Sequence, residues 1–342
     1  MQKRFNIKRV YNLVLILFLI SLFAYLCFSD NGLIELVTKL KGFHKGWLFM
    51  AFFCHLFNIA IDIYLIYKFT ANMEPRYTLK NAVRSSMIGQ FFSAITPSSS
   101  GGQPMQVYAM SKQGVDSGLA TSALVQKFLV YQTVLTFYSM LAILIRIDYF
   151  NSLNQIVWTL ALIGFIAQAV VIAAILLVSF NEKLTFRIIS LLFHFFARIH
   201  VVKNADEKIE NIKQALISFH EGNKELYRGK KIFFTTYTLT IIQLTAMFLV
   251  PYCIYRAFYL EGASVINMVC AQSFVTMTSC LVPIPGASGA TEGASSIFFS
   301  PFFGETTIKS AIALSRFISY YFTILISFPF TKTVKNRKNN VE

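Results

Sequence analysis

The sequence predicts an all-α polytopic membrane protein. Hydrophobic residues make up 55% of the 342 positions and charged residues only 14%, with a mean hydropathy of +0.56. A soluble globular chain carries about 25% charged residues. Apolar runs of about 20 residues, the length that crosses a bilayer as a helix, recur along the chain. This composition argues against a soluble enzyme, a disordered chain and a disulfide-rich secreted module.

Six apolar runs are predicted to span the membrane. The first follows four basic residues but has no small-residue cleavage site, so we expect a retained signal-anchor helix. The six runs are Val10–Phe28, Trp47–Tyr67, Leu119–Ile145, Ile156–Phe180, Ile232–Leu260 and Ile308–Phe330.

Two further apolar stretches, 82–110 and 265–303, are each interrupted by a cluster of Pro, Gly and Ser. Such a cluster cannot continue a helix. Irregular backbone at membrane depth has to be buried in protein or line a cavity. We therefore expect two re-entrant helical hairpins, with connecting loops between full spans as the alternative.

Basic residues set the expected topology. With six spans and a cytoplasmic N-terminus, 23 of the 31 Lys and Arg residues lie inside and six lie outside, while Lys127 and Arg316 lie within spans. This bias follows the positive-inside rule and puts both termini in the cytoplasm of a cell-membrane protein. The net charge of +15 is then explained by topology and by anionic lipid headgroups, so no nucleic-acid partner is expected.

Two pairs of short segments indicate an inverted internal repeat. Pro97–Gly101 matches Pro285–Gly289 as P-x-x-S-G, and Lys127–Tyr131 matches Arg316–Tyr320 as a basic residue, Phe, Leu or Ile, any residue and Tyr, at separations of 188 and 189 residues. The charge bias makes the hairpins enter from opposite sides, an architecture found in transporters. The expected single membrane domain (1–342) divides into repeat 1 (10–180), amphipathic cytoplasmic or interfacial helices (181–231), repeat 2 (232–330) and a cytoplasmic tail (331–342).

Lys127 and Arg316 are the leading candidate site residues. Each lies eight residues into its span, about 12 Å deep, where a basic side chain is tolerated only beside protein, a partner or water. They are interpreted as anchors for an anionic group or, alternatively, as members of ion pairs with Asp62 and Glu292. Hairpin-tip amides and hydroxyls would add anion donors. The other candidates are Ser99, Ser100, Gly101, Gly102, Ser288, Gly289, Glu292, Tyr131 and Tyr320.

The segment Val282–Gly293 resembles the P-x-P-G-x-x-G-x-x-E-G signature of the lysylphosphatidylglycerol synthase transmembrane-region family, with Ala287 where many members have Gly. Ile95–Pro104 is similar to an earlier Pro/Gly-rich element of that family. The resemblance implies a lipid-flippase domain, found alone or fused to an aminoacyl transferase. Since the chain ends twelve residues after Phe330, we expect no transferase domain and no lysyltransferase activity.

The predicted function is translocation of an anionic, phosphate-bearing lipid: an aminoacyl-phospholipid, a glycolipid or a polyprenyl phosphate. The alternatives are a lysyltransferase-type lipid-modifying enzyme, a small-anion transporter and an accessory subunit. The five Cys residues lack metal-ligand spacing, so neither a metal nor another cofactor is expected. Expected partners are the membrane lipid, a second copy of the chain or a separate lipid-synthesising enzyme.

Overall fold

The computed structural model describes residues 42–145, 155–198, 205–279 and 289–331, and its regular elements in these ranges are all helical. The predicted all-α polytopic class is confirmed. The predicted span Val10–Phe28 lies outside the described residues. Among the described residues, five helical stretches are long and apolar enough to cross a membrane: Lys45–Met73, Ser117–Ile145, Ile163–Phe180, Lys230–Ala257 and Thr307–Thr331.

The first group of helices places two short helices between two long ones. It consists of α3 (Lys45–Met73), α4 (Leu79–Ile95), the 3-10 turn η2 (Pro97–Ser99), α5 (Gly102–Lys112) and α6 (Ser117–Ile145). The Thr78 side chain accepts the Asn81 N–H at 3.3 Å and starts α4, and Pro97 follows its end. α4 and α5 pack against each other. At 17 and 11 residues they are about 25 and 16 Å long, shorter than an apolar core of about 30 Å.

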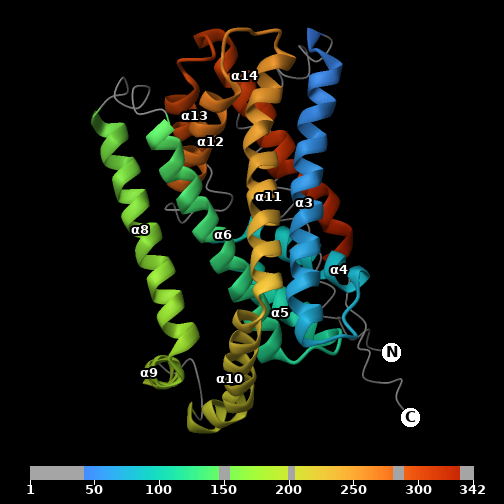
Figure 1. The fold of residues 1–342 in the computed structure, drawn as a ribbon, viewed down its shortest axis with the longest axis vertical. Helices are drawn as coiled ribbons and strands as arrows, with labels where there is room; N and C mark the ends of the chain where they lie inside the picture. Colours follow the sequence, from blue (N-terminus) through green and yellow to red (C-terminus); the bar gives the residue numbers. More distant parts are fainter. Residues whose placement is uncertain (1–41, 146–154, 199–204, 280–288, 332–342) are drawn as a thin grey trace, which may run out of the picture.

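Three helices without a counterpart elsewhere in the described chain connect this group to the next. α8 (Gln155–Phe180) is long and apolar, whereas α9 (Glu182–Arg198) and α10 (Ala205–Arg228) are amphipathic, in agreement with the predicted sequence pattern. Figure 1 shows α9 nearly end-on at the foot of the upright α8, so α9 runs across the long axis of the molecule.

The second group repeats the order of the first: long, short, short, long. It consists of α11 (Lys230–Ala257), α12 (Val265–Ser279), α13 (Ala290–Phe299) and a composite last helix. The composite helix runs through α14 (Glu305–Arg316), the π turn η4 (Phe317–Tyr321), α15 (Phe322–Ser327) and the 3-10 turn η5 (Phe328–Thr331). α12 packs against α13. Most of the Pro/Gly cluster between them lies outside the described residues.

The helices α3 and α11 pack side by side at the centre of the molecule (Figure 1). The α4–α5 pair lies toward the end that carries α10, and the α12–α13 pair lies toward the opposite end, beside α14. We call these the α10 end and the α14 end. The two short-helix pairs therefore occupy opposite ends of the molecule.

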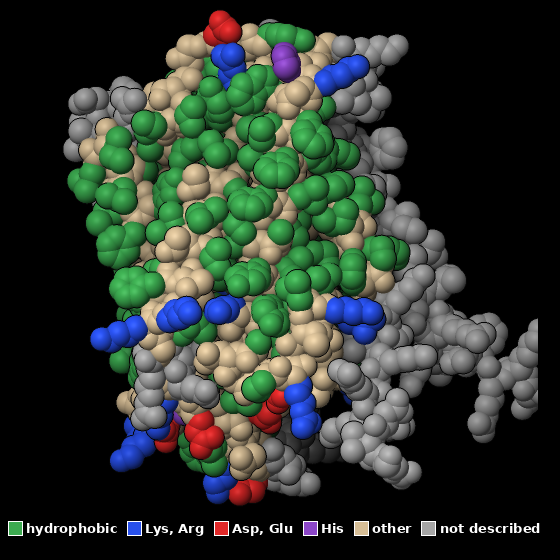
Figure 2. All heavy atoms as spheres, turned by 45° about the vertical axis from the view of Figure 1, so that its right-hand side comes forward, with side chains coloured by type: hydrophobic (Ala, Val, Ile, Leu, Met, Phe, Trp, Pro, Cys, Tyr) green, Lys and Arg blue, Asp and Glu red, His purple; other side chains and the backbone are tan. Residues whose placement is uncertain are grey.

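The surface is divided into an apolar middle and charged ends. On the face drawn in Figure 2, hydrophobic side chains cover a broad band, and Lys, Arg, Asp and Glu gather above and below it. Exposed apolar side chains on α3, α6 and α8 include Phe49, Phe137 and Ile166. An apolar band of this kind is the surface that a bilayer covers.

Candidate functional site

A cavity of about 660 Å³ lies among helices from both groups. Its walls come from α3, α4, η2, α5, α6, α11 and the composite last helix. The polar residues that line it are Asn58, Asp62, Gln90, Ser93, Ser99, Ser100, Gln103, Gln106, Lys127, Tyr131, Gln243, Ser319, Tyr320 and Thr323. Amides and hydroxyls, which both donate and accept hydrogen bonds, therefore outnumber charged groups in this cavity.

Lys127 of α6 reaches the cavity as half of an ion pair. Its Nζ lies 2.6 Å from Oδ1 of Asp62 on α3, and the two side chains are 18% and 17% exposed. The Ser86 hydroxyl of α4 donates to the other carboxylate oxygen of Asp62 at 2.7 Å. Three helices thus meet at one carboxylate, and the pair leaves the cavity wall electrically balanced.

Arg316 forms a second ion pair, with Glu292 of α13. The Arg316 Nε donates to Glu292 Oε1 at 2.7 Å. Oε2 of Glu292 accepts the N–H of Gly289 at 2.6 Å, so this carboxylate also caps the start of α13. Gly289 has φ of 83°, a left-handed conformation that favours glycine. The N-terminus of α13 is therefore occupied by the protein's own anion in this structure.

Tyr320 connects the two ion-paired regions. It lines the large cavity, and its ring lies under the Arg316 guanidinium, 4.8 Å from ring centre to guanidinium carbon. Its hydroxyl donates to the carbonyl of Ala94, near the end of α4, at 2.9 Å. Tyr320 thus joins the last helix of the second group to the short-helix pair of the first.

A smaller cavity of about 170 Å³ continues from the large one toward the α14 end. The two share Asn58, Gln90, Met247, Ser319 and Thr323 as lining residues. His55 lines the smaller cavity and shares a hydrogen bond of 2.8 Å with the Thr323 hydroxyl. Among the described residues, the void that follows beside Pro251 and Ser315 has a volume of about 10 Å³, at the lower limit for one water molecule. The cavity volume along this passage therefore decreases from the part lined by Lys127 toward the α14 end.

The structure brings most of the candidate residues together. Lys127, Tyr131, Ser99, Ser100 and Tyr320 line the large cavity. Arg316 and Glu292 lie next to it through the contact with Tyr320. Gly289 lies at the start of α13, and Ser288 lies outside the described residues.

Gly101 and Gly102 are not among the lining residues of the large cavity. The Gly101 N–H donates to the Thr96 hydroxyl at 2.9 Å. A Cβ on Gly102 would collide with the Ser93 side chain. Both glycines therefore shape the α4–α5 turn, and Gly102 allows α5 to approach α4 closely.

Several polar lining residues were not predicted from the sequence, chiefly Asn58, Gln243 and Ser319. The sequence does contain a signal for Asn58. His55, Asn58 and Asp62 are separated by three and four residues, which places them on one helix face inside an apolar span. Ser319 and Thr323 repeat this spacing. A polar stripe within a spanning helix indicates a protein-facing or cavity-facing surface. In the described parts of the chain, no cluster of three or more His, Cys, Asp or Glu side chains could hold a metal ion.

Comparison with known proteins gives a consistent result. Residues 10–327 match the family model described as the lysylphosphatidylglycerol synthase TM region. A UPF0104 membrane protein from Archaeoglobus fulgidus is 25% identical to the chain over 279 residues, which cover 78% of this chain and 82% of the relative. The match to the family model includes both short-helix pairs and both ion-paired cations.

Proposed function

The chain belongs to the lysylphosphatidylglycerol synthase transmembrane-region family, and from this premise we propose that it moves an anionic, phosphate-bearing lipid between the two leaflets of a membrane. Its all-α, multi-pass architecture fits a domain that works within a bilayer. Candidate lipids are aminoacyl-phospholipids, glycolipids and polyprenyl phosphates, which share a polar phosphate-bearing head and apolar chains.

The observation that carries the proposal is the cavity with many polar side chains in its walls, lying among helices with apolar outer surfaces. A lipid headgroup cannot cross hydrocarbon unaided because its charges and hydrogen-bonding groups lose water. The cavity offers amides, hydroxyls and the Lys127 ammonium in place of that water. Its volume of about 660 Å³ lies within the range of ligand pockets, about 300–1,000 Å³.

The Asp62–Lys127 pair suits a site that is filled and emptied in turn. A lone ammonium at membrane depth is costly, and Asp62 offsets that cost while the cavity is empty. An arriving phosphate can replace Asp62 as the partner of Lys127, since phosphate oxygens are strong acceptors for an ammonium. The two sequence-based interpretations of Lys127, ion pair and anion anchor, are then two stages of one cycle.

We further propose that the two short-helix pairs are re-entrant hairpins of an inverted repeat, and that access alternates between them. Their positions at opposite ends and the repeated element order support this proposal. The decrease in cavity volume toward the α14 end supports an arrangement that is open to one side. The basic residues near the α10 end support an orientation in which that end faces the cytoplasm at a cell membrane, in line with the positive-inside rule.

We propose transport without chemical modification of the lipid. A separate enzyme would then synthesise the lipid that this chain moves. Purified protein incubated with phosphatidylglycerol and lysyl-tRNA should form no lysyl-lipid, as measured by thin-layer chromatography. Formation of lysyl-lipid would contradict this part of the proposal.

The transport proposal is tested in proteoliposomes that contain a fluorescent phosphatidylglycerol, with leaflet exposure measured by dithionite quenching. We expect Lys127→Gln to slow transfer about ten-fold or more, because a hydrogen bond to a charged group contributes about 1.5–3 kcal/mol. Lys127→Arg should retain part of the rate. Lys80→Gln, which changes an exposed Lys on α4, is the matched control.

Three outcomes would contradict the proposal. In the first, Lys127→Gln transfers lipid at the wild-type rate. In the second, a diacylglycerol without phosphate is transferred equally fast by a route that depends on Lys127. In the third, the protein carries inorganic phosphate across the membrane and leaves the lipid in place. The last result would identify a small-anion transporter.

A further inference from the structure

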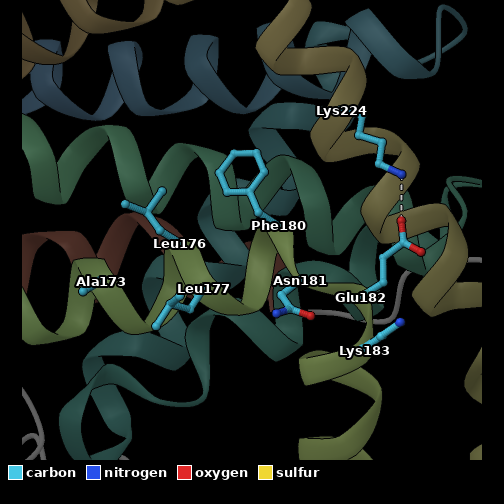
Figure 3. A pocket seen from close by; sticks show the side chains of 8 residues that line it. All are labelled: Ala173, Leu176, Leu177, Phe180, Asn181, Glu182, Lys183 and Lys224. Carbon is cyan, nitrogen blue, oxygen red and sulfur yellow. Dashed lines mark hydrogen bonds and ion pairs between the residues drawn. The ribbon is translucent and has the colours of Figure 1, made fainter.

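The junction of α8, α9 and α10 carries a second cavity that shares no residue with the passage described above. Its volume is about 780 Å³ and it opens broadly to the surface. Its lining residues are Ala173, Leu176, Leu177, Phe180, Asn181, Glu182, Lys183 and Lys224 (Figure 3). The first four come from the last turns of α8. Asn181, Glu182 and Lys183 form the corner between α8 and α9, and Lys224 comes from α10.

The corner is fixed by local hydrogen bonds. The Asn181 side chain accepts the Leu184 N–H at 3.0 Å and caps the start of α9. The Asn223 amide of α10 donates to the Ser179 carbonyl at 3.1 Å, and the ring nitrogen Nδ1 of His220 lies 3.1 Å from the same oxygen. The crosswise direction of α9 and the position of α10 are therefore set by contacts with the end of α8.

The walls of this cavity divide into an apolar and a basic part. Leu177 and Phe180 are 59% and 53% exposed along α8, on the side that continues into the apolar band. Lys183 and Lys224 lie at the foot of α8, where α9 crosses it (Figure 3). Exposed Phe186 and Leu191 beside exposed Arg187 make α9 a helix of the kind that lies in the headgroup region.

The charge of the basic part is positive by one unit. Lys224 Nζ lies 2.7 Å from Glu182 Oε1, and these two side chains balance each other. The hydrogen bond and the charge of Lys224 lower the pKa of Glu182, so this carboxylate stays ionised at neutral pH. Lys183, which also lines the cavity, adds the extra positive charge and lies next to Glu182 in Figure 3.

We propose that the α8–α9–α10 corner is a binding site for an anionic phospholipid that stays in one leaflet, distinct from the lipid being moved. An acyl chain lies along Leu176, Leu177 and Phe180, and the phosphate contacts Lys183. Apolar contact and charge then act on one amphiphilic ligand, as in other basic, membrane-facing pockets. The bound lipid would hold the foot of α8, which has the smallest buried fraction among the five span-length helices described.

The test titrates the purified full-length protein in neutral detergent with phosphatidylglycerol or with phosphatidylcholine of the same chains, and follows binding by native mass spectrometry and melting temperature. We expect tighter binding of phosphatidylglycerol. Lys183→Gln should weaken that binding about five-fold, the value of one basic residue near an anionic lipid. Glu182→Gln should strengthen it, because it frees Lys224.

Lys213→Gln is the matched control, since Lys213 is exposed on α10 outside this cavity and pairs only with its neighbour Glu210 in the described chain. Equal binding of phosphatidylglycerol by wild type and Lys183→Gln would overturn the proposal. So would weaker binding in Glu182→Gln, equal binding of phosphatidylcholine, or the same melting shift with inorganic phosphate alone. Because the readout is binding, a failure here leaves the transport proposal intact, and a failure of transport leaves this site intact.

Discussion

Lys127 and Arg316 occupy matching places in the two helix groups, yet the structure surrounds them differently. Lys127 belongs to the uninterrupted α6, pairs with a carboxylate from the long helix α3, and lines the large cavity. Arg316 ends α14 immediately before a π turn, and its partner Glu292 also caps the short helix α13. The same sequence pattern therefore holds one cation at the wall of the large cavity and the other at the start of a short helix.

Lys127 and Arg316 are therefore not equivalent, although the sequences around them are similar. At Lys127 the counter-charge comes from a different long helix, so the pair can separate without changing either helix end. At Arg316 the counter-charge comes from the first turn of α13, so separating that pair also uncaps a helix. Under the proposed function, the first pair is suited to exchange with a ligand, whereas the second also holds the start of α13.

The greatest change in stability is expected when the two ion-paired carboxylates, Glu292 and Asp62, are each removed. Glu292→Ala removes one partner of Arg316 and the cap of α13, and we expect it to lower the free energy of unfolding by about 2–3 kcal/mol. Asp62→Ala should cost about 1 kcal/mol less than Glu292→Ala, because Asp62 caps no helix in the described residues. Unfolding in mixed micelles measures both, with Glu210→Ala on exposed α10 as control. Equal losses would remove the distinction between the two pairs.

A smaller change in stability is expected when one glycine in each short-helix pair is replaced by alanine. A Cβ on Gly102 would collide with the Ser93 side chain and lie 2.9 Å from the Gly89 carbonyl oxygen, whereas a Cβ on Gly293 meets no described atom within 4 Å. Gly102→Ala should therefore destabilise the protein by about 1–3 kcal/mol. Gly293→Ala should leave stability unchanged or raise it by up to about 1 kcal/mol, because alanine favours helix. Melting temperatures in detergent should fall for Gly102→Ala and stay unchanged or rise for Gly293→Ala. A fall in both variants, or in neither, would refute this difference between the two short-helix pairs.

The smallest effect concerns the link between the two groups. Tyr320→Phe removes the hydrogen bond to the Ala94 carbonyl but keeps the ring under Arg316. We expect a loss of about 0.5–1.5 kcal/mol in the free energy of unfolding. Tyr64→Phe, which changes an exposed tyrosine on α3, controls for the general effect of losing a hydroxyl. A change no larger than that control would mean that this bond does not hold the groups together.

Much of the fold follows from patterns that the sequence displays openly. The apolar runs predict the long helices from Lys45 onward because a bilayer demands continuous apolar surface. Pro97 predicts the break after α4 because it cannot continue the helix. The charge and apolar spacing of Asp206–Tyr227 predicts the amphipathic helix α10.

The site was less predictable, because it depends on contacts between distant segments. Lys127 and Arg316 stand out as charges in apolar runs, but the sequence left their pairing open. Whether Asp62 meets Lys127 depends on how α3 packs against α6, and a one-residue change in register would turn it elsewhere. The contact of Tyr320 with Ala94 joins residues 226 positions apart, and neither residue signals it locally.

The Asp62–Lys127 pair has a consequence for how voltage acts on the protein. An unoccupied cavity that holds both charges together has no net charge from this pair, so the transmembrane potential exerts no net force on it. A solitary ammonium crossing the whole field would gain or lose about 2.3 kcal/mol for every 100 mV. The return of the empty protein would then be nearly independent of voltage, and any electrical work would be done on the cargo alone.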